Sequence, residues 1–290
     1  MPEKTLWLFW SALACTHLLA GSVKRINRKY SVDISRLCSI IVHMRIAATS
    51  DLHGILPSHP PMHYDNDTLA VHDFDVLIVA GDVAPNIWQS LKQEKEWTKR
   101  NFYPWLEIVP AKHKIFIAGN HDLYWEHKTQ QEIQAILPPN CHYLYDSGVS
   151  IDGIYFYGTP WQPVFMRWAF NRSHEEQARK FAMIPERTDV LITHCPPYGF
   201  GDIDKATKCN HPRSNPHEHL GSLALRNAIL DKKPRYNVFG HIHSGGHKPY
   251  EHQIENQVVT MVNVSYINES YDPEYPFFTF EIEPVKYDNK

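Results

Sequence analysis

The chain lacks any Cys-x-x-Cys pair and has only five cysteines among its 290 residues. An odd number of widely separated cysteines does not build a disulfide framework and is typical of proteins in a reducing compartment. We therefore expect a cytoplasmic protein. The five are Cys15, Cys38, Cys141, Cys195 and Cys209.

A run of lysines or arginines is also absent, and the formal net charge is only −3 at pH 7. A nucleic-acid-binding face needs a concentrated positive surface, so we expect no stable nucleic-acid partner. Long linkers, internal repeats and low-complexity segments are missing too, and the chain is 43% hydrophobic and 21% charged. This composition is typical of a globular protein, and we predict one domain over residues 44–290.

The first 43 residues differ from the rest of the chain. Leu6–Ala20 is almost continuously apolar, Lys4 precedes it, and several basic residues follow it. A signal peptide or a membrane anchor would have this pattern, although the run is short for a membrane span. A third interpretation is an upstream extension, because Met44 directly opens the first predicted core strand. We favour the extension, and we expect secretion or membrane attachment only if residues 6–20 are a true signal or anchor.

Short apolar runs predict buried strands, and several of these runs end where polar residues begin. Segments with helical spacing lie between them, and this alternation predicts an α/β domain whose sheet is largely covered on both faces. The predicted strands are Arg45–Ser50, Phe74–Ala80, Lys114–Ala118, Asp189–Thr193, Asn237–Phe239, Val258–Val264 and Phe277–Ile282. The predicted helices are Trp88–Leu106, Gln130–Leu137, His219–Leu230, and one that starts at the capping-box residue Ser173 and ends near Pro185.

Eight polar side chains follow the ends of five of these strands: Asp51, His53, Asp82, Asn120, His121, His194, His241 and His243. Ligands in open α/β sheets bind at the carboxyl ends of the strands, so we expect these side chains to meet. Carboxylate, amide and imidazole ligands without thiolates suit Mn, Fe or Zn. The set is too large for one ion, and we predict two divalent metal ions about 3.5–4 Å apart, joined by a bridging carboxylate.

The order of these motifs resembles the calcineurin-like metallophosphoesterase family. The motifs are Asp51-x-His53, Gly81-Asp82, Gly119-Asn120-His121-Asp122, a lone His194 and Gly240-His241-x-His243. The segments Gly158–Pro163 and Thr193–Pro197 resemble a narrower subgroup, the small metallophosphoesterase-domain proteins related to class III cyclic-nucleotide phosphodiesterases. A glycine usually follows the lone histidine in that subgroup, whereas Cys195 stands here.

The resemblance implies an α/β fold in which two sheets form a β-sandwich flanked by helices. It also implies two sets of metal ligands. The first set is Asp51, His53 and His243, and the second is Asn120, His194 and His241.

The same resemblance implies the reaction. Asp82 would bridge the two ions, His121 would protonate the leaving group, and Asp122 would orient His121. The implied activity is hydrolysis of a small phosphoester by a metal-bound hydroxide, with phosphodiesters, cyclic nucleotides among them, favoured over monoesters.

Two rival functions remain at this stage. One is a non-catalytic metal-binding scaffold of the same fold, and the complete ligand set argues against it. The other is a nuclease of the DNA-repair type, and the absence of a basic groove signal argues against it. Four aromatic residues could stack on a nucleobase, but we favour core packing for most of them: Trp161, Phe165, Trp168 and Phe170. For Cys195 we favour a buried filler over a redox-sensitive thiol.

Overall fold

The apolar run that starts at Met44 forms an inner strand of a five-stranded sheet. Strand β1 (Met44–Thr49) pairs in parallel with β2 (Val76–Ala80) and antiparallel with β13 (Phe278–Ile282). Strands β3 (His113–Ile117) and β4 (Cys141–Tyr143) extend the sheet, and the order is β13-β1-β2-β3-β4. The computed structural model describes residues 43–57, 74–86, 90–203 and 218–284, so the predictions for the first 42 residues lie outside the described residues.

A second, six-stranded sheet has the order β11-β12-β10-β9-β6-β5. Its bounds are β5 (Ser147–Ile151), β6 (Ile154–Thr159), β9 (Val190–Thr193), β10 (Tyr236–Phe239), β11 (Tyr250–Ile254) and β12 (Gln257–Asn263). A small ribbon of β7 (Gln162–Pro163) and β8 (Asn171–Arg172) lies apart from both sheets. Strands β9 and β10 are parallel, so their carboxyl ends lie at the same edge.

Successive residues of the central strands face two different cores. In β1, Ile46 and Ala48 belong to an apolar cluster that also contains Val190 and Val238 of the other sheet. Ala47 belongs instead to a cluster that contains helix residues such as Phe102. Because strand side chains alternate between faces, the even residues of β1 join the two sheets and the odd ones face the helices.

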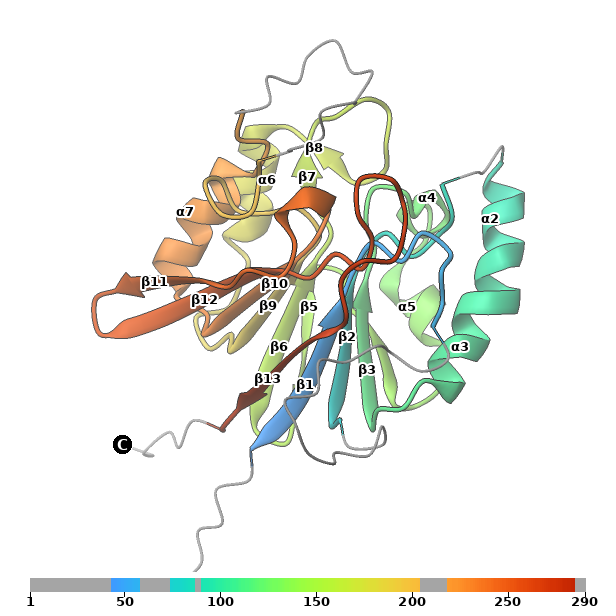
Figure 1. Ribbon diagram of the computed structural model, residues 1–290, viewed down its shortest axis with the longest axis horizontal. Coiled ribbons are helices and arrows are strands. Elements are labelled where there is room, and N and C mark those ends of the chain that lie inside the picture. The colour runs from blue at the N-terminus through green and yellow to red at the C-terminus, as the bar shows by residue number, and fades with distance from the viewer. Residues whose placement is uncertain (1–42, 58–73, 87–89, 204–217, 285–290) are drawn as a thin grey trace, which may run out of the picture. The chain divides into compact units, whose positions relative to one another are not determined.

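The helices flank the sheets (Figure 1). Beside the five-stranded sheet lie α2 (Leu91–Trp97), α3 (Tyr103–Ile108), α4 (Leu123–Glu126) and α5 (Gln130–Gln134). Beside the six-stranded sheet lie α6 (His174–Phe181) and α7 (Leu223–Lys232). The α/β fold with two sheets flanked by helices is therefore confirmed. In the part of the chain that is described, no helix has the length and apolar character needed to cross a membrane.

Local sequence signals account for the starts of several helices. The Ser173 capping box is confirmed, since the Ser173 hydroxyl accepts from the backbone N–H of Glu176 and the Glu176 carboxylate accepts in return. The helix expected over Trp88–Leu106 is confirmed from Leu91 onward, Trp88 lies outside the described residues, and the π-helical turn η2 (Thr98–Phe102) connects α2 to α3. The helix expected from His219 begins only at Leu223, where the Ser222 side chain caps its first turn.

Candidate metal centre

Four of the predicted ligands have left-handed backbone conformations at the strand ends. The φ angles are 53° for Asp51, 41° for His53, 52° for Asp82 and 71° for His241. This conformation costs a non-glycine residue roughly 1–3 kcal/mol and persists only where the surroundings enforce it. Such strain is concentrated at functional sites.

Two of the motif glycines stand where no side chain fits. A Cβ atom on Gly119 would overlap the Oδ1 atom of Asp82, and one on Gly240 would overlap the Ser50 hydroxyl and the Asp51 carboxylate. The glycines therefore let the strand-end loops approach the two carboxylates closely.

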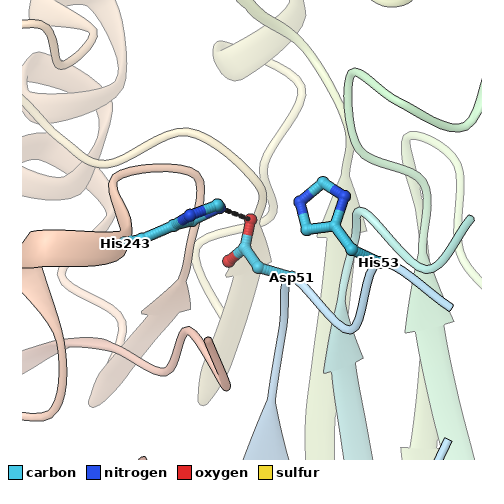
Figure 2. Close-up of side chains that lie close together, drawn as sticks. All are labelled: Asp51, His53 and His243. Atoms are coloured by element: carbon cyan, nitrogen blue, oxygen red, sulfur yellow. Dashed lines mark ion pairs between the residues drawn. The ribbon is translucent and has the colours of Figure 1, made fainter. Parts of the chain in front are cut away.

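The first cluster consists of Asp51, His53 and His243, whose ligand atoms lie within 4.8 Å of one another. Figure 2 shows the two rings on either side of the Asp51 carboxylate. The Nε2 atom of His243 is 3.5 Å from Oδ1 of Asp51. Its Nδ1 atom is 3.2 Å from the carbonyl oxygen of Asn268, so Nδ1–H donates there and Nε2 presents its lone pair to the site.

Hydroxyl and backbone donors hold the Asp51 carboxylate in place. Its Oδ2 atom accepts from the hydroxyls of Ser50 at 2.5 Å and Ser265 at 2.7 Å, and from the backbone N–H of His241 at 3.0 Å. Supporting hydrogen bonds of this kind fix the orientation of ligating carboxylates.

The second cluster consists of Asp82, His194 and His241, again within 4.8 Å. The Nδ1 atom of His194 is 2.9 Å from the carbonyl oxygen of Ala80, so Nδ1–H donates and Nε2 faces the site. That Nε2 atom is 3.3 Å from Oδ2 of Asp82 and 3.0 Å from Oδ1 of Asn120. The structure thus brings six of the seven predicted ligands into these two groups, and the seventh, Asn120, contacts His194 of the second group.

Asp82 lies between the two groups. Its Oδ2 atom is 3.6 Å from Nε2 of His53 and 3.3 Å from Nε2 of His194. Its Oδ1 atom accepts the backbone N–H of His121 at 2.8 Å. A carboxylate in this position is suited to bridge two cations.

His53 supplies the observation that fits a metal ion. Both of its ring nitrogens are buried and lack a hydrogen-bond partner among the described residues. Leaving buried polar atoms unpaired costs about 1–3 kcal/mol each unless another ligand satisfies them. A divalent cation would satisfy a neutral imidazole, and the oxygen and nitrogen donor set suits Mn, Fe or Zn.

The electrostatics keep two histidines neutral. Burial lowers the pKa of His53 to about 4 and that of His241 to about 3. Metal ligation requires neutral imidazole, so these rings are ready to bind at neutral pH without releasing a proton. His194 differs, because burial lowers its pKa but the Asp82 charge outweighs burial and raises the pKa to about 9.

The two carboxylates stay ionised. Burial raises the pKa of Asp51, but the hydrogen bond and charge of His243 outweigh burial and leave that pKa below its ordinary value. For Asp82, burial again raises the pKa, and the charges of His194 and His121 outweigh it. Two buried carboxylates that remain charged form a strong attraction for cations.

His121 lies beside the second cluster, with Nε2 3.9 Å from Oδ2 of Asp82. Asp122 has a different contact from the one expected, because its carboxylate does not bond to the His121 ring. It accepts the backbone N–H groups of Val83 at 3.1 Å, Ala84 at 3.0 Å and Gly119 at 2.8 Å. Asp122 therefore ties together the two loops that carry Asp82 and His121.

Two aromatic residues lie near the site. From sequence, Trp168 was named only as one of four aromatic residues, and Tyr271 was not named. The Trp168 ring centroid is 4.1 Å from that of His121, whereas Trp161 and Phe170 are core residues as favoured. The Tyr271 ring packs edge-on against His53 at 4.9 Å and His243 at 5.3 Å. No motif marks either residue, although Trp168 follows the segment resembling the subgroup.

Cys195 is a buried filler, as favoured. Its side chain is fully buried, its thiol donates to the carbonyl of Trp161 at 3.3 Å, and burial raises its pKa to about 12. A thiol with so little thiolate is a poor redox sensor.

A sequence profile for calcineurin-like phosphoesterase matches residues 44–245, a range that includes every motif residue described above. The chain belongs to this family. It is 33% identical over 239 residues to metallophosphoesterase domain-containing protein 1 of Homo sapiens. The alignment covers 74% of this chain and 66% of the human protein. It is 34% identical over 200 residues to a UPF0046 protein of Caenorhabditis elegans. That alignment covers 59% of this chain and 46% of the worm protein.

One solved crystal structure resembles the fold of this family member. It aligns with a TM-score of 0.51 and 14% identity, and the alignment covers 84% of this chain and 100% of the other. At this level of identity the likeness concerns the fold alone. The family and the His/Asp clusters together support a metal-dependent phosphoester hydrolase.

Proposed function

We propose that the chain hydrolyses small phosphodiesters with the help of two divalent metal ions. The observation that carries the proposal is the position of Asp82, whose Oδ2 atom lies 3.6 Å from His53 and 3.3 Å from His194, between the two groups of buried ligand atoms. A single ion would leave one of these groups without a partner.

In this proposal each ligand has a defined place. Asp51, His53 and His243 would hold one ion, and Asn120, His194 and His241 would hold the other. Asp82 would contribute to both. Two bound cations, Mn, Fe or Zn, would offset the negative charge of the phosphoester and lower the pKa of a bound water toward neutrality.

His121 is the proposed proton donor. Its ring is buried and its Nε2 atom lies near the Asp82 carboxylate, at the edge of the ligand cluster. Burial lowers the pKa of His121, and the charge of Asp82 opposes that effect. An alkoxide leaving group needs a proton, and the Asp82 charge favours the protonated ring that would supply it.

The test compares metal-free and Mn-loaded full-length protein on two substrates, a bis-aryl phosphodiester and an aryl phosphomonoester. We expect Mn to restore hydrolysis, with the diester turned over faster. Asp82→Asn should lower the rate by about 10²-fold or more, because it removes the shared negative charge. His174→Ala, an exposed histidine at the start of α6, is the matched control and should retain the wild-type rate.

A result against the proposal is equally clear. If the protein binds Mn yet hydrolyses neither ester, the chain is better described as a metal-binding scaffold. If Asp82→Asn retains wild-type activity, the dinuclear arrangement is wrong.

A further inference from the structure

Trp168 lies directly beside the proposed proton donor. Its ring centroid is 4.1 Å from that of His121, with the two ring planes inclined at 46°. Trp168 is only half-buried, so part of its surface remains available to a bound molecule. A large aromatic side chain placed at a site edge with free surface is suited to ligand contact.

The backbone around Trp168 is tied to the loop that carries His121. The N–H of Ala169 donates to the carbonyl of Asn120 at 3.1 Å, and the N–H of Phe170 donates to the Glu126 carboxylate at 2.9 Å. Phe170 also has a left-handed backbone, with φ of 57°. These contacts hold Trp168 at a fixed place relative to His121, which lowers the entropic cost of using it for binding.

The segment between β7 and β8 that leads to Trp168 contains three exposed apolar residues. Val164, Phe165 and Met166 are 67%, 44% and 57% exposed. Tyr271 has different surroundings, since it packs on the first-cluster residues His53 and His243 and its hydroxyl accepts from the Asn86 amide at 3.0 Å. Trp168 is thus the large aromatic side chain beside His121, whereas Tyr271 lies beside the first cluster.

We propose that Trp168 contacts the leaving group of the substrate and selects leaving groups that carry a planar ring. The proposal rests on the function proposed above, in which His121 protonates the leaving oxygen. A ring attached close to that oxygen must lie beside His121. Among the described Trp, Tyr and Phe residues, Trp168 is the one whose ring contacts His121. Offset or edge-on contact between two rings then favours a planar group over an aliphatic one.

The test uses binding of phosphonates, which are not hydrolysed. Phenylphosphonate and methylphosphonate both present the same anion, and they differ in the ring. We expect calorimetry on the Mn-loaded full-length protein to show phenylphosphonate binding on the order of tenfold more tightly. Trp168→Leu should abolish most of this ratio while leaving the affinity for methylphosphonate unchanged, and Trp168→Phe should retain most of it.

Other outcomes overturn the proposal. An unchanged ratio in Trp168→Leu shows that the ring is not recognised by Trp168. An equal loss of affinity for both phosphonates shows that Trp168 only supports the site, and Mn stoichiometry and thermal unfolding of each variant check its fold. If the wild-type protein binds neither phosphonate, the anion site fails and the proposed function fails with it. If both phosphonates bind but Trp168→Leu leaves their ratio unchanged, only the role of Trp168 fails.

A second pair of ligands identifies the source of the ring. Adenosine 5′-monophosphate and ribose 5-phosphate share the phosphate and the sugar and differ in the base. If the wild type prefers the nucleotide and Trp168→Leu removes that preference, the contact at Trp168 is assigned to nucleobases. A preference seen only with the phenyl compound assigns it to aryl esters.

Discussion

Asp82 shows how one residue can organise the site. Its Oδ2 atom lies between 3.3 and 3.9 Å from the Nε2 atoms of three histidines, and its Oδ1 atom accepts the backbone N–H of His121. The three histidines are His53, His121 and His194. One carboxylate therefore attracts the ligand rings and also fixes the loop that carries the proposed proton donor.

His121 can be tested through the leaving group. Proton donation matters most when the departing oxygen is basic, so His121→Ala should slow an alkyl ester by about 10²–10⁴-fold. It should slow an ester with an acidic nitrophenol leaving group much less. The measurement is kcat for both esters with the Mn-loaded wild type and variant.

Metal content separates this role from ligation. His121 also falls within reach of His53 and Asp82 as a geometric ligand group. We expect His121→Ala to keep the wild-type number of bound Mn ions, measured by elemental analysis. A lost ion, or an equal slowing of both esters, would show that His121 acts as a ligand instead.

At the scale of elements, the short helix α4 links the site to α2. Its second residue, Tyr124, donates its backbone N–H to Oε1 of Glu94 at 2.8 Å. Glu94 is almost fully buried, and its Oε2 atom has no hydrogen-bond partner among the described residues. Burial, with a smaller contribution from the Asp82 charge, raises the pKa of Glu94 to about 7.

This raised pKa predicts a dependence of stability on pH. The ordinary value is 4.5, so the folded chain binds the Glu94 proton more tightly than the unfolded chain does. The resulting stabilisation is complete below about pH 4.5 and is lost as the pH rises to about 7. Glu94→Gln keeps the acceptor for Tyr124 and removes the titration. Between pH 5 and pH 8 the wild type should therefore lose on the order of 2 kcal/mol more of its unfolding free energy than the variant does.

Urea unfolding of both proteins at the two pH values, with chelator present throughout, measures this difference. Glu96→Gln is the matched control, since Glu96 is exposed on the same helix, and it should keep the wild-type pH dependence. Equal pH dependence in the wild type and Glu94→Gln would show that Glu94 is solvated or paired in solution.

The strands could be predicted to different extents, for physical reasons. Fully buried strands such as β2 and β9 are continuous apolar runs and were predicted. Strands β5 and β11 lie at sheet edges and contain many half-exposed polar residues, so no apolar run marks them. The helix of α2, η2 and α3 was predicted from helical spacing, but that spacing does not reveal the π-helical turn within it.

The site shows the same division. Each predicted ligand follows an apolar run within a few residues, so local sequence reveals it. Trp168 lies beside His121 in a segment whose next residue, Ala169, bonds to Asn120, which is far away in the sequence. Tyr271 reaches His53 through the loop that follows β12. Contacts made by such distant pairings leave no local pattern.

At the scale of the whole described unit, the site lies where the two sheets meet. Asp51 follows β1 of the five-stranded sheet, and it accepts the backbone N–H of His241, which follows β10 of the other sheet. Asp82 follows β2, and its Oδ2 atom lies 3.3 Å from His194, which follows β9. Ions bound at the proposed positions would therefore cross-link the sheets through side chains.

This cross-linking predicts that metal removal weakens the entire fold. A ligand at about 100 times its Kd adds roughly 2.7 kcal/mol of stability when it binds only the folded state. For a chain of this size, chelation should lower Tm by about 5–10 °C, and Mn should restore it. Calorimetry of wild type and Asp82→Asn, each with chelator and with Mn, measures the effect.

The variant should gain much less from Mn, because removing the Asp82 charge weakens binding on both sides of the junction, whereas His174→Ala should respond as the wild type does. A Tm that ignores Mn in the wild type would mean that bound ions add nothing to the apolar layer and the hydrogen bonds that already join the two sheets.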